Sequence, residues 1–123
     1  MSKLEKHIQI TRAYDVDEST KGYRVLVDRL WPRGIKKESL RLDHWAKELA
    51  PSTKLRKWFD HDPERWDDFQ RRYEEELAER NTEMRQLMEE VGDSQTILLI
   101  YAAKDQYHNH ATVLRRVLET VFS

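Results

Sequence analysis

The most apolar run of the chain, Thr96–Ala102, is the feature that most restricts how this sequence can fold. The run contains no charged residue, and it lies between Gly92 and the polar pair Lys104-Asp105. A short apolar run with such bounds is typical of a strand that is buried on both faces. The sequence therefore predicts an α/β fold in which residues 96–102 form a central strand.

A second apolar run, Tyr23–Asp28, predicts another strand, which Pro32 and Gly34 follow as breakers of regular structure. The long stretch between the two runs has helical patterns, so the two strands can be parallel neighbours with their carboxyl ends side by side. An earlier strand is expected within His7–Ala13. Its link to Tyr23–Asp28 is too short for a crossover helix, so any direct pairing of these two strands is expected to be antiparallel.

Apolar residues recur at helical spacing in much of the remaining chain, where capping residues and prolines mark the helix ends. The expected inward-facing residues are Leu40, Leu42 and Trp45; Leu55, Trp58 and Phe59; Trp66, Phe69, Tyr73 and Leu77; Met84, Leu87, Met88 and Val91; and Ala111, Leu114, Leu118, Val121 and Phe122. The whole pattern predicts one small α/β domain over residues 1–123. Its sheet is at least partly parallel and is flanked by helices in a three-layer, sandwich-like arrangement.

The composition excludes several classes of protein. The chain has no cysteine, so disulfides, zinc thiolates and cysteine nucleophiles are ruled out. No apolar run approaches the ~18 residues of a membrane span, and the N-terminal residues lack the apolar core of a signal peptide. We therefore expect a cytoplasmic protein that has no membrane partner.

Positive charge is concentrated in segment 29–61, which holds 9 basic and 4 acidic side chains although the whole chain has a net charge of −1. Trp31, Trp45 and Trp58 are interleaved with these basic residues. Cationic and aromatic groups in this pattern can bind phosphates and stack on bases. The alternative is that the aromatic rings face the core while the basic side chains face water.

Two polar clusters follow the two main strands and are expected to meet at one edge of the sheet, where open α/β folds bind ligands. Asp28, Arg29 and Arg33 follow the strand 23–28, and a second cluster of Lys104, Asp105, His108 and Asn109 follows the strand 96–102. The helix that begins near Asn109 would direct its backbone amides toward the same crevice, which favours anions. The sequence therefore predicts an anion-binding crevice at this edge.

Each residue of this crevice has an expected role. Arg29, Arg33, Arg56 and Lys104 would hold phosphate, because the guanidinium group matches phosphate geometry. Trp31 or Trp58 would stack on a ring of the ligand. Asp105 or His108 would be the catalytic acid–base group, since histidine titrates near neutral pH. Asp28 and Asn109 complete the candidate ligand-binding set.

Structural explanations compete with several of these roles. Asp28 and Arg29 fit a buried ion pair at the strand end as well as they fit a ligand site. Ser52 is explained more simply as a helix cap than as a nucleophile activated by His61. A metal site is not expected, because His108 and His110 would lie on different helix faces. The three glycines form no phosphate-binding loop, so no cofactor is expected.

Several of these segments resemble the signatures of the YeaO-like family, a domain of unknown function numbered 488. The matching segments are Val25–Gly34, Trp45–Ser52, Leu55–Asp62, Leu99–Asp105 and His108–Ala111. The resemblance covers nearly the whole chain, and it implies an α/β sandwich that carries two signatures at adjacent strand ends. It supplies no activity that can be carried over.

The sequence thus favours a protein that binds a small phosphorylated or nucleotide-like ligand, with or without a reaction on it. The alternative is a nucleic-acid-binding or regulatory domain that uses segment 29–61, although its near-neutral net charge argues against this reading. A third possibility is a protein-interaction module that uses the acidic helix 63–80.

Overall fold

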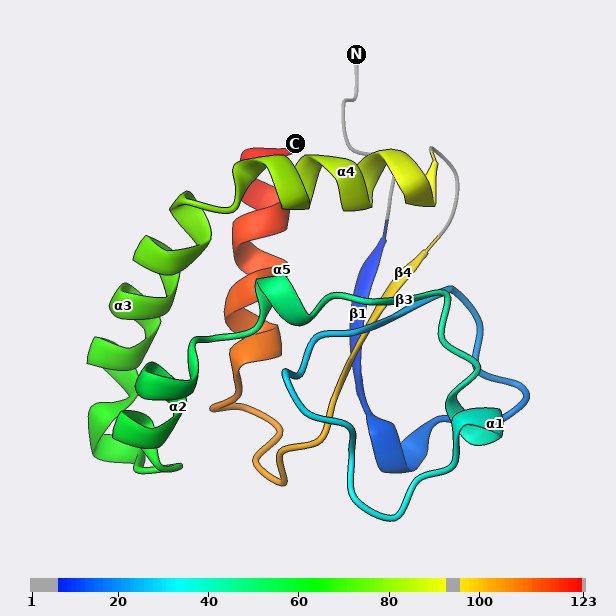
Figure 1. Ribbon diagram of the computed structural model, residues 1–123, viewed down its shortest axis with the longest axis horizontal. Coiled ribbons are helices and arrows are strands. Elements are labelled where there is room, and N and C mark those ends of the chain that lie inside the picture. The colour runs from blue at the N-terminus through cyan, green and yellow to red at the C-terminus, as the bar shows by residue number, and fades with distance from the viewer. Residues whose placement is uncertain (1–6, 93–95, 123) are drawn as a thin grey trace.

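One four-stranded parallel sheet, in the order β1-β4-β2-β3, organises the computed structural model, which describes residues 7–92 and 96–122. The strands are β1 (Ile8–Arg12), β2 (Tyr23–Leu26), β3 (His44–Trp45) and β4 (Ile97–Tyr101). All five residues of β4 are buried, and this strand lies between β1 and β2 (Figure 1). The prediction of a buried central strand within residues 96–102 is therefore confirmed.

The strands β2 and β4 are parallel neighbours, as predicted, with Val25 opposite Leu99. The strands β1 and β2 do not pair directly, so the antiparallel arrangement expected for a direct pairing does not arise, and both strands run parallel to β4. Their link leaves room for β4 instead of forming a hairpin. It approaches β4 closely at Gly22, where a Cβ atom would lie 3.1 Å from the Thr96 carbonyl oxygen and where φ is +122°.

The described residues form five α-helices beside the sheet: α1 (Lys37–Leu40), α2 (Thr53–Phe59), α3 (Trp66–Ala78), α4 (Asn81–Val91) and α5 (His110–Val121). Single 3-10 turns occur at Ala13–Asp15, Lys47–Leu49 and Pro63–Arg65. Two helices begin with capping side chains of the types that favour this position. The Ser52 hydroxyl accepts from the Leu55 amide at 3.1 Å, and the Asn109 side chain accepts from the Thr112 amide at 3.2 Å.

The segment before Pro51 differs from its predicted helix. The helix α1 ends at Leu40, the backbone turns at Arg41 with a φ of +49°, and His44–Trp45 then pairs with β2 as an edge strand. The amides of Asp43 and Ala46 donate to β2 carbonyls, so this edge pairing satisfies backbone groups that would otherwise lack partners. Leu40, Leu42 and Trp45 therefore do not lie on one helix as predicted, because the segment after Leu40 pairs with the edge of the sheet instead.

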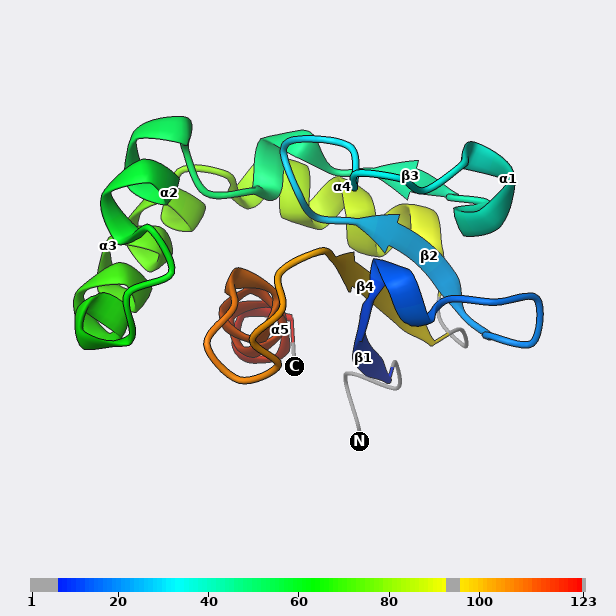
Figure 2. The same ribbon diagram turned by 90° about the horizontal axis from the view of Figure 1, so that it is seen from below.

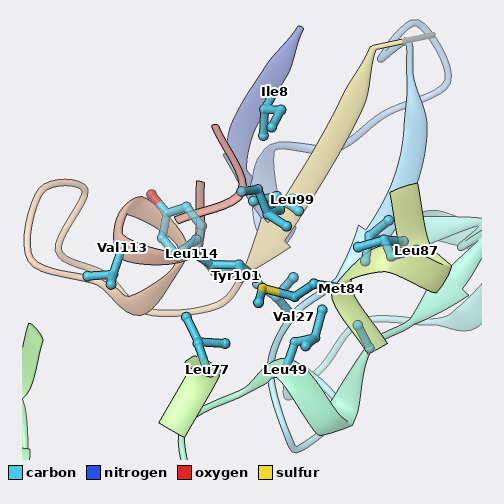
Figure 3. Packing of buried hydrophobic residues seen from close by; sticks show 14 of the residues in the cluster. Ile8, Val27, Leu49, Leu77, Met84, Leu87, Leu99, Tyr101, Val113 and Leu114 are labelled. Atoms are coloured by element: carbon cyan, nitrogen blue, oxygen red, sulfur yellow. The ribbon is translucent and has the colours of Figure 1, made fainter. Parts of the chain in front are cut away.

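The two faces of the sheet are covered differently. Val25, Leu99 and Tyr101 face the helices α2–α5, while Leu26 and Ile100 face a smaller cluster. Figure 3 shows side chains from the strands and from α3, α4 and α5 that converge beside Val27. The smaller cluster is covered by loops and α1 and includes Leu40, Trp31, Ile35, Leu42 and Trp45. The layered α/β class is confirmed, with loops and a single short helix in place of one helical layer.

Phe69, Tyr73 and Leu77 of the stripe predicted for α3 and all four residues predicted for α4 are buried in the core, whereas Trp66 is only partly buried and packs against it. The stripe predicted for α5 holds at Ala111, Leu114 and Leu118 but not at Val121, which is 49% exposed. Among the described residues, no helix has the length and apolar character needed to cross a membrane.

Candidate functional site

A pocket of about 470 Å³ opens at the carboxyl ends of β2 and β4. Three segments form its walls: the loop after β2, the end of α2 with residues 56–61, and the loop from β4 to α5. In Figure 1 the two loops appear in cyan and orange below the sheet, with α2 beside them, and Figure 2 shows the same group from below. The lining residues are Tyr14, Asp28–Arg33, Ala50, Pro51, Arg56, Phe59, His61, Phe69, Ala102, Ala103 and His108–His110.

The structure brings most of the predicted site residues together. Asp28, Arg29, Trp31, Arg33, Arg56, His108 and Asn109 all line the pocket. Lys104 does not line it and points to solvent, and Asp105 reaches it only through its contact with His108. Trp58 lies in a separate groove, where the Arg72 guanidinium stands 4.2 Å from its ring centroid.

The three arginines of the pocket differ in how their guanidinium groups are used. Arg29 donates to the carbonyls of Pro51 and Ala50 at 3.3 and 3.4 Å, so it ties the loop after β2 to the segment before α2. The guanidinium groups of Arg33 and Arg56 have no hydrogen-bond or ion-pair partner among the described residues. Arg33 is held through its backbone, because its carbonyl accepts from the Tyr14 hydroxyl at 2.9 Å. Two guanidinium groups are therefore available to a ligand.

Asp28 is paired with His110 and not with Arg29. Its Oδ2 accepts from the Ala102 amide at 3.0 Å, and its Oδ1 lies 2.9 Å from His110 Nε2. The same Nε2 is 2.9 Å from the Val27 carbonyl oxygen, with which the N–H aligns, and Oδ1 is buried without an aligned hydrogen bond. Because both neighbours are acceptors, Nε2 must carry a proton.

This Asp28–His110 contact joins the end of β2 to the first turn of α5. The two side chains are only 16% and 15% exposed. The Tyr73 ring packs edge-on against His110 at 6.2 Å, and its hydroxyl donates to the Leu49 carbonyl at 2.5 Å. Burial, the largest cause, raises the pKa of Tyr73 well above its ordinary value, so this hydroxyl stays a donor. The inner wall of the pocket is therefore a fixed polar network.

The loop after β4 is organised by Asp105. Its Oδ1 accepts from the amides of Tyr107 and His108 at 2.8 and 2.9 Å, and its Oδ2 lies 2.9 Å from His108 Nδ1. The backbone amide of His108, followed by that of Tyr107 and by the His108 side chain, lowers the pKa of Asp105 to about 2. His108 thus has its Nδ1 bound to a carboxylate, while its Nε2 has no partner within the described part of the chain.

We expect the Asp105 carboxyl to titrate with a midpoint near pH 2, well below the ordinary value of 3.8. Because the folded-state pKa is lowered, the loop contacts of Asp105 are complete above about pH 4 and are lost as the pH falls through 2. Side-chain carboxyl chemical shifts of Asp105 in an NMR titration measure this midpoint directly. A midpoint near 4 would show that the amides do not hold the carboxylate.

Aromatic rings connect two walls of the pocket. Phe59 stacks on Phe69 at 4.5 Å and lies 5.8 Å from Trp66, which meets the His108 ring edge-on at 5.4 Å. The end of α2 and the loop after β4 therefore share one rigid aromatic cluster. Trp31 is fixed too, because its Nε1 donates to the Ile35 carbonyl at 2.6 Å.

Two predicted residues have structural duties. Asn109 uses its amide oxygen to cap α5 and donates from its Nδ2 to the Asp105 carbonyl at 2.9 Å. Ser52 caps α2 and donates to Glu76 Oε2 at 2.6 Å, so its hydroxyl is engaged without His61. Within residues 7–92 and 96–122, no cluster of His, Asp or Glu has the geometry to hold a metal ion.

Sequence reasoning did not assign His61, His110, Tyr14 or Leu30 to the crevice. Leu30 and Tyr14 are 61% and 47% exposed, and they give the pocket an apolar border. The signal for His110 was its place directly after Asn109, at the start of α5. For His61 it was the position just beyond the end of α2, beside the basic segment.

The fold and the pocket thus define a small α/β protein with a basic crevice at the carboxyl ends of parallel strands. A family model described as the inactive DUF488-N3 subclade matches residues 7–123, and the chain belongs to this family. It is 47% identical to the uncharacterized protein YeaO of Escherichia coli strain K12 over 108 residues, which cover 88% of this chain and 93% of that protein.

A second relative is the uncharacterized protein Rv3073c of Mycobacterium tuberculosis strain H37Rv, which is 39% identical over 114 residues. The match covers 93% of this chain and 95% of that protein. The uncharacterized protein Mb3100c of Mycobacterium bovis matches with the same identity and coverage. No solved structure gives a significant match.

Proposed function

We propose that this protein binds a small phosphorylated or nucleotide-like ligand in the pocket at the carboxyl ends of β2 and β4. The observation that carries the proposal is the imbalance of charge in the lining. Arg29, Arg33 and Arg56 stand against a single carboxylate, Asp28, and two of the three guanidinium groups have no partner of their own within the described residues. Unpaired guanidinium groups in a concave site favour a phosphate group, which they can bind with two parallel hydrogen bonds.

The shape and the remaining lining support the same ligand class. A volume of about 470 Å³ lies within the range of roughly 300–1,000 Å³ that small-molecule sites occupy. The exposed Tyr14 and Leu30 at the border offer apolar contact to a sugar or a base, while the cationic groups contact its phosphate.

Binding without turnover is the form of the proposal that the family favours, because the matching subclade is described as inactive. The Asp105–His108 pair remains the acid–base candidate if a reaction occurs, since His108 lines the pocket and its Nε2 has no partner among the described residues. Phosphorus NMR of a bound phosphorylated probe separates the two cases, and we expect the probe to be recovered unchanged.

Matched ligand pairs test the proposal. We expect AMP and ribose 5-phosphate to raise the melting temperature, whereas adenosine and ribose do not. A ligand at 100 times its dissociation constant stabilises the folded state by about 2.7 kcal/mol. Equal shifts for the phosphorylated and unphosphorylated members would mean that the arginines do not bind phosphate, and no shift for any of them would remove the proposal.

The nucleic-acid alternative is tested by measuring how the affinity for an oligonucleotide depends on salt concentration. Affinity for an oligonucleotide that falls steeply with salt, with a slope set by the number of phosphates contacted, would favour a domain that uses segment 29–61. We expect weak oligonucleotide binding and a small salt slope, because a pocket contacts only one or two phosphates.

A further inference from the structure

Two consecutive residues after α2, Asp60 and His61, have left-handed backbone conformations, with φ values of +47° and +55°. They form the turn that ends α2: the Asp60 amide donates to the Arg56 carbonyl, and the Asp62 amide donates to the Phe59 carbonyl. For residues other than glycine, a left-handed conformation costs about 1–2 kcal/mol. Glycine adopts it freely and is the residue that usually ends helices in this way.

The contacts of the His61 imidazole do not explain why a histidine occupies this position. The ring is exposed, it contacts the Phe59 ring at a centroid distance of 6.3 Å, and neither nitrogen has a hydrogen-bond partner among the residues described. It nevertheless lines the pocket. A side chain that makes no stabilising polar contact, at a position where glycine would be less strained, is best explained by a requirement for its imidazole in the pocket.

His61 lines the same pocket as the two guanidinium groups that have no partner among the described residues. Arg56 lies in the last turn of α2, five residues before His61, and Arg33 lines the pocket from the loop after β2. The nearby carboxylate of Asp62 does not line the pocket, because it accepts from the Glu64 amide and faces Arg65 Nε at 3.8 Å. Asp60 also lies outside the lining.

Provided that the pocket binds phosphate as proposed above, we propose that His61, Arg33 and Arg56 together select a terminal phosphate monoester over a phosphodiester. A monoester presents three oxygens and a charge of about −1.5 to −2 at pH 7. A diester has one negative charge and only two free oxygens, so it cannot engage three cationic or donor groups equally well. The ligand is therefore a phosphomonoester, such as a nucleoside monophosphate or a sugar phosphate.

Isothermal titration calorimetry with AMP and 3′,5′-cyclic AMP tests this assignment, because the two ligands share base and sugar and differ in the phosphate. The wild-type protein should bind AMP at least tenfold more tightly than cyclic AMP. The variant His61→Asn tolerates the left-handed conformation and removes the imidazole. It should lose about tenfold in affinity for AMP and little for cyclic AMP, so that the preference disappears.

The variant His61→Gly is the matched control for folding. It removes the same imidazole but relieves the backbone strain, so its thermal stability should equal or exceed that of the wild type, with the same loss of preference. Unchanged AMP affinity in both variants would overturn the role of His61 while leaving phosphate binding intact. Equal wild-type affinities for AMP and cyclic AMP would overturn the selection of monoesters. If neither ligand binds, the proposed phosphate site itself is wrong.

Discussion

Replacing Arg33 by alanine should weaken the binding of AMP by about 100-fold and leave the free energy of unfolding within about 1 kcal/mol of the parent value. Hydrogen bonds to charged groups contribute about 1.5–3 kcal/mol each, and 1.4 kcal/mol corresponds to a tenfold change in affinity. The Arg33 guanidinium has no partner in the described structure, and what fixes this residue is the bond from Tyr14 to its carbonyl, which alanine keeps. Folding therefore loses little when the side chain is removed.

Calorimetric titration with AMP and denaturant unfolding of the same preparation measure the two effects together. Lys104→Ala is the matched control, because it removes a positive charge from the loop after β4 that does not line the pocket. It should change AMP affinity by less than threefold, as expected for a screened, exposed charge. If Arg33→Ala instead unfolds the protein while binding per folded molecule is unchanged, Arg33 is structural and the pocket loses its main phosphate-binding group.

His110→Ala should destabilise the protein by about 3 kcal/mol, the upper end of the range for leaving a largely buried acceptor without its donor. The substitution removes the donor of the Val27 carbonyl and leaves Asp28 without its imidazole contact at 2.9 Å. Arg29→Ala should cost only about 1 kcal/mol. It removes two long hydrogen bonds to carbonyls and does not isolate Asp28.

The two variants therefore discriminate between the two possible partners of Asp28. Urea denaturation of His110→Ala, Arg29→Ala and the corresponding double mutants with Asp28→Asn gives the coupling energies. We expect a clear coupling between Asp28 and His110 and a small one between Asp28 and Arg29. A larger loss for Arg29→Ala than for His110→Ala would mean that the ion pair with Arg29 forms in solution. His110→Gln retains an N–H donor and should recover part of the stability.

Local patterns in the sequence were sufficient to predict much of the fold. The apolar runs that became β2 and β4 were recognisable because a buried strand needs consecutive apolar residues, whatever its neighbours are. The cap at Ser52 was also readable, because a capping side chain bonds to an amide two or three residues away. Once both strands and the long crossover were known, the carboxyl-end edge followed as the place for a site.

The partners within that site could not be predicted, because they join residues that are far apart in the chain. The bond from the Ala102 amide to Asp28 spans 74 residues, and the contact of His110 with the Val27 carbonyl spans 83. Adjacency in sequence suggested that Arg29 would neutralise Asp28. In the folded chain the Arg29 side chain turns to the carbonyls of Ala50 and Pro51, which only tertiary packing brings within reach.

The sequence by itself determined which segments form the two central strands and the buried stripes of α3, α4 and α5, since the spacing of apolar residues is a local property. The tertiary structure alone decided that β4 enters between β1 and β2, that residues 44–45 become an edge strand, and that Lys104 stays outside the pocket while His61 lines it. These outcomes depend on which backbone groups and side chains meet after the strands are ordered. Each such hydrogen bond or pocket wall forms between segments that are distant in the sequence, so no single segment encodes it.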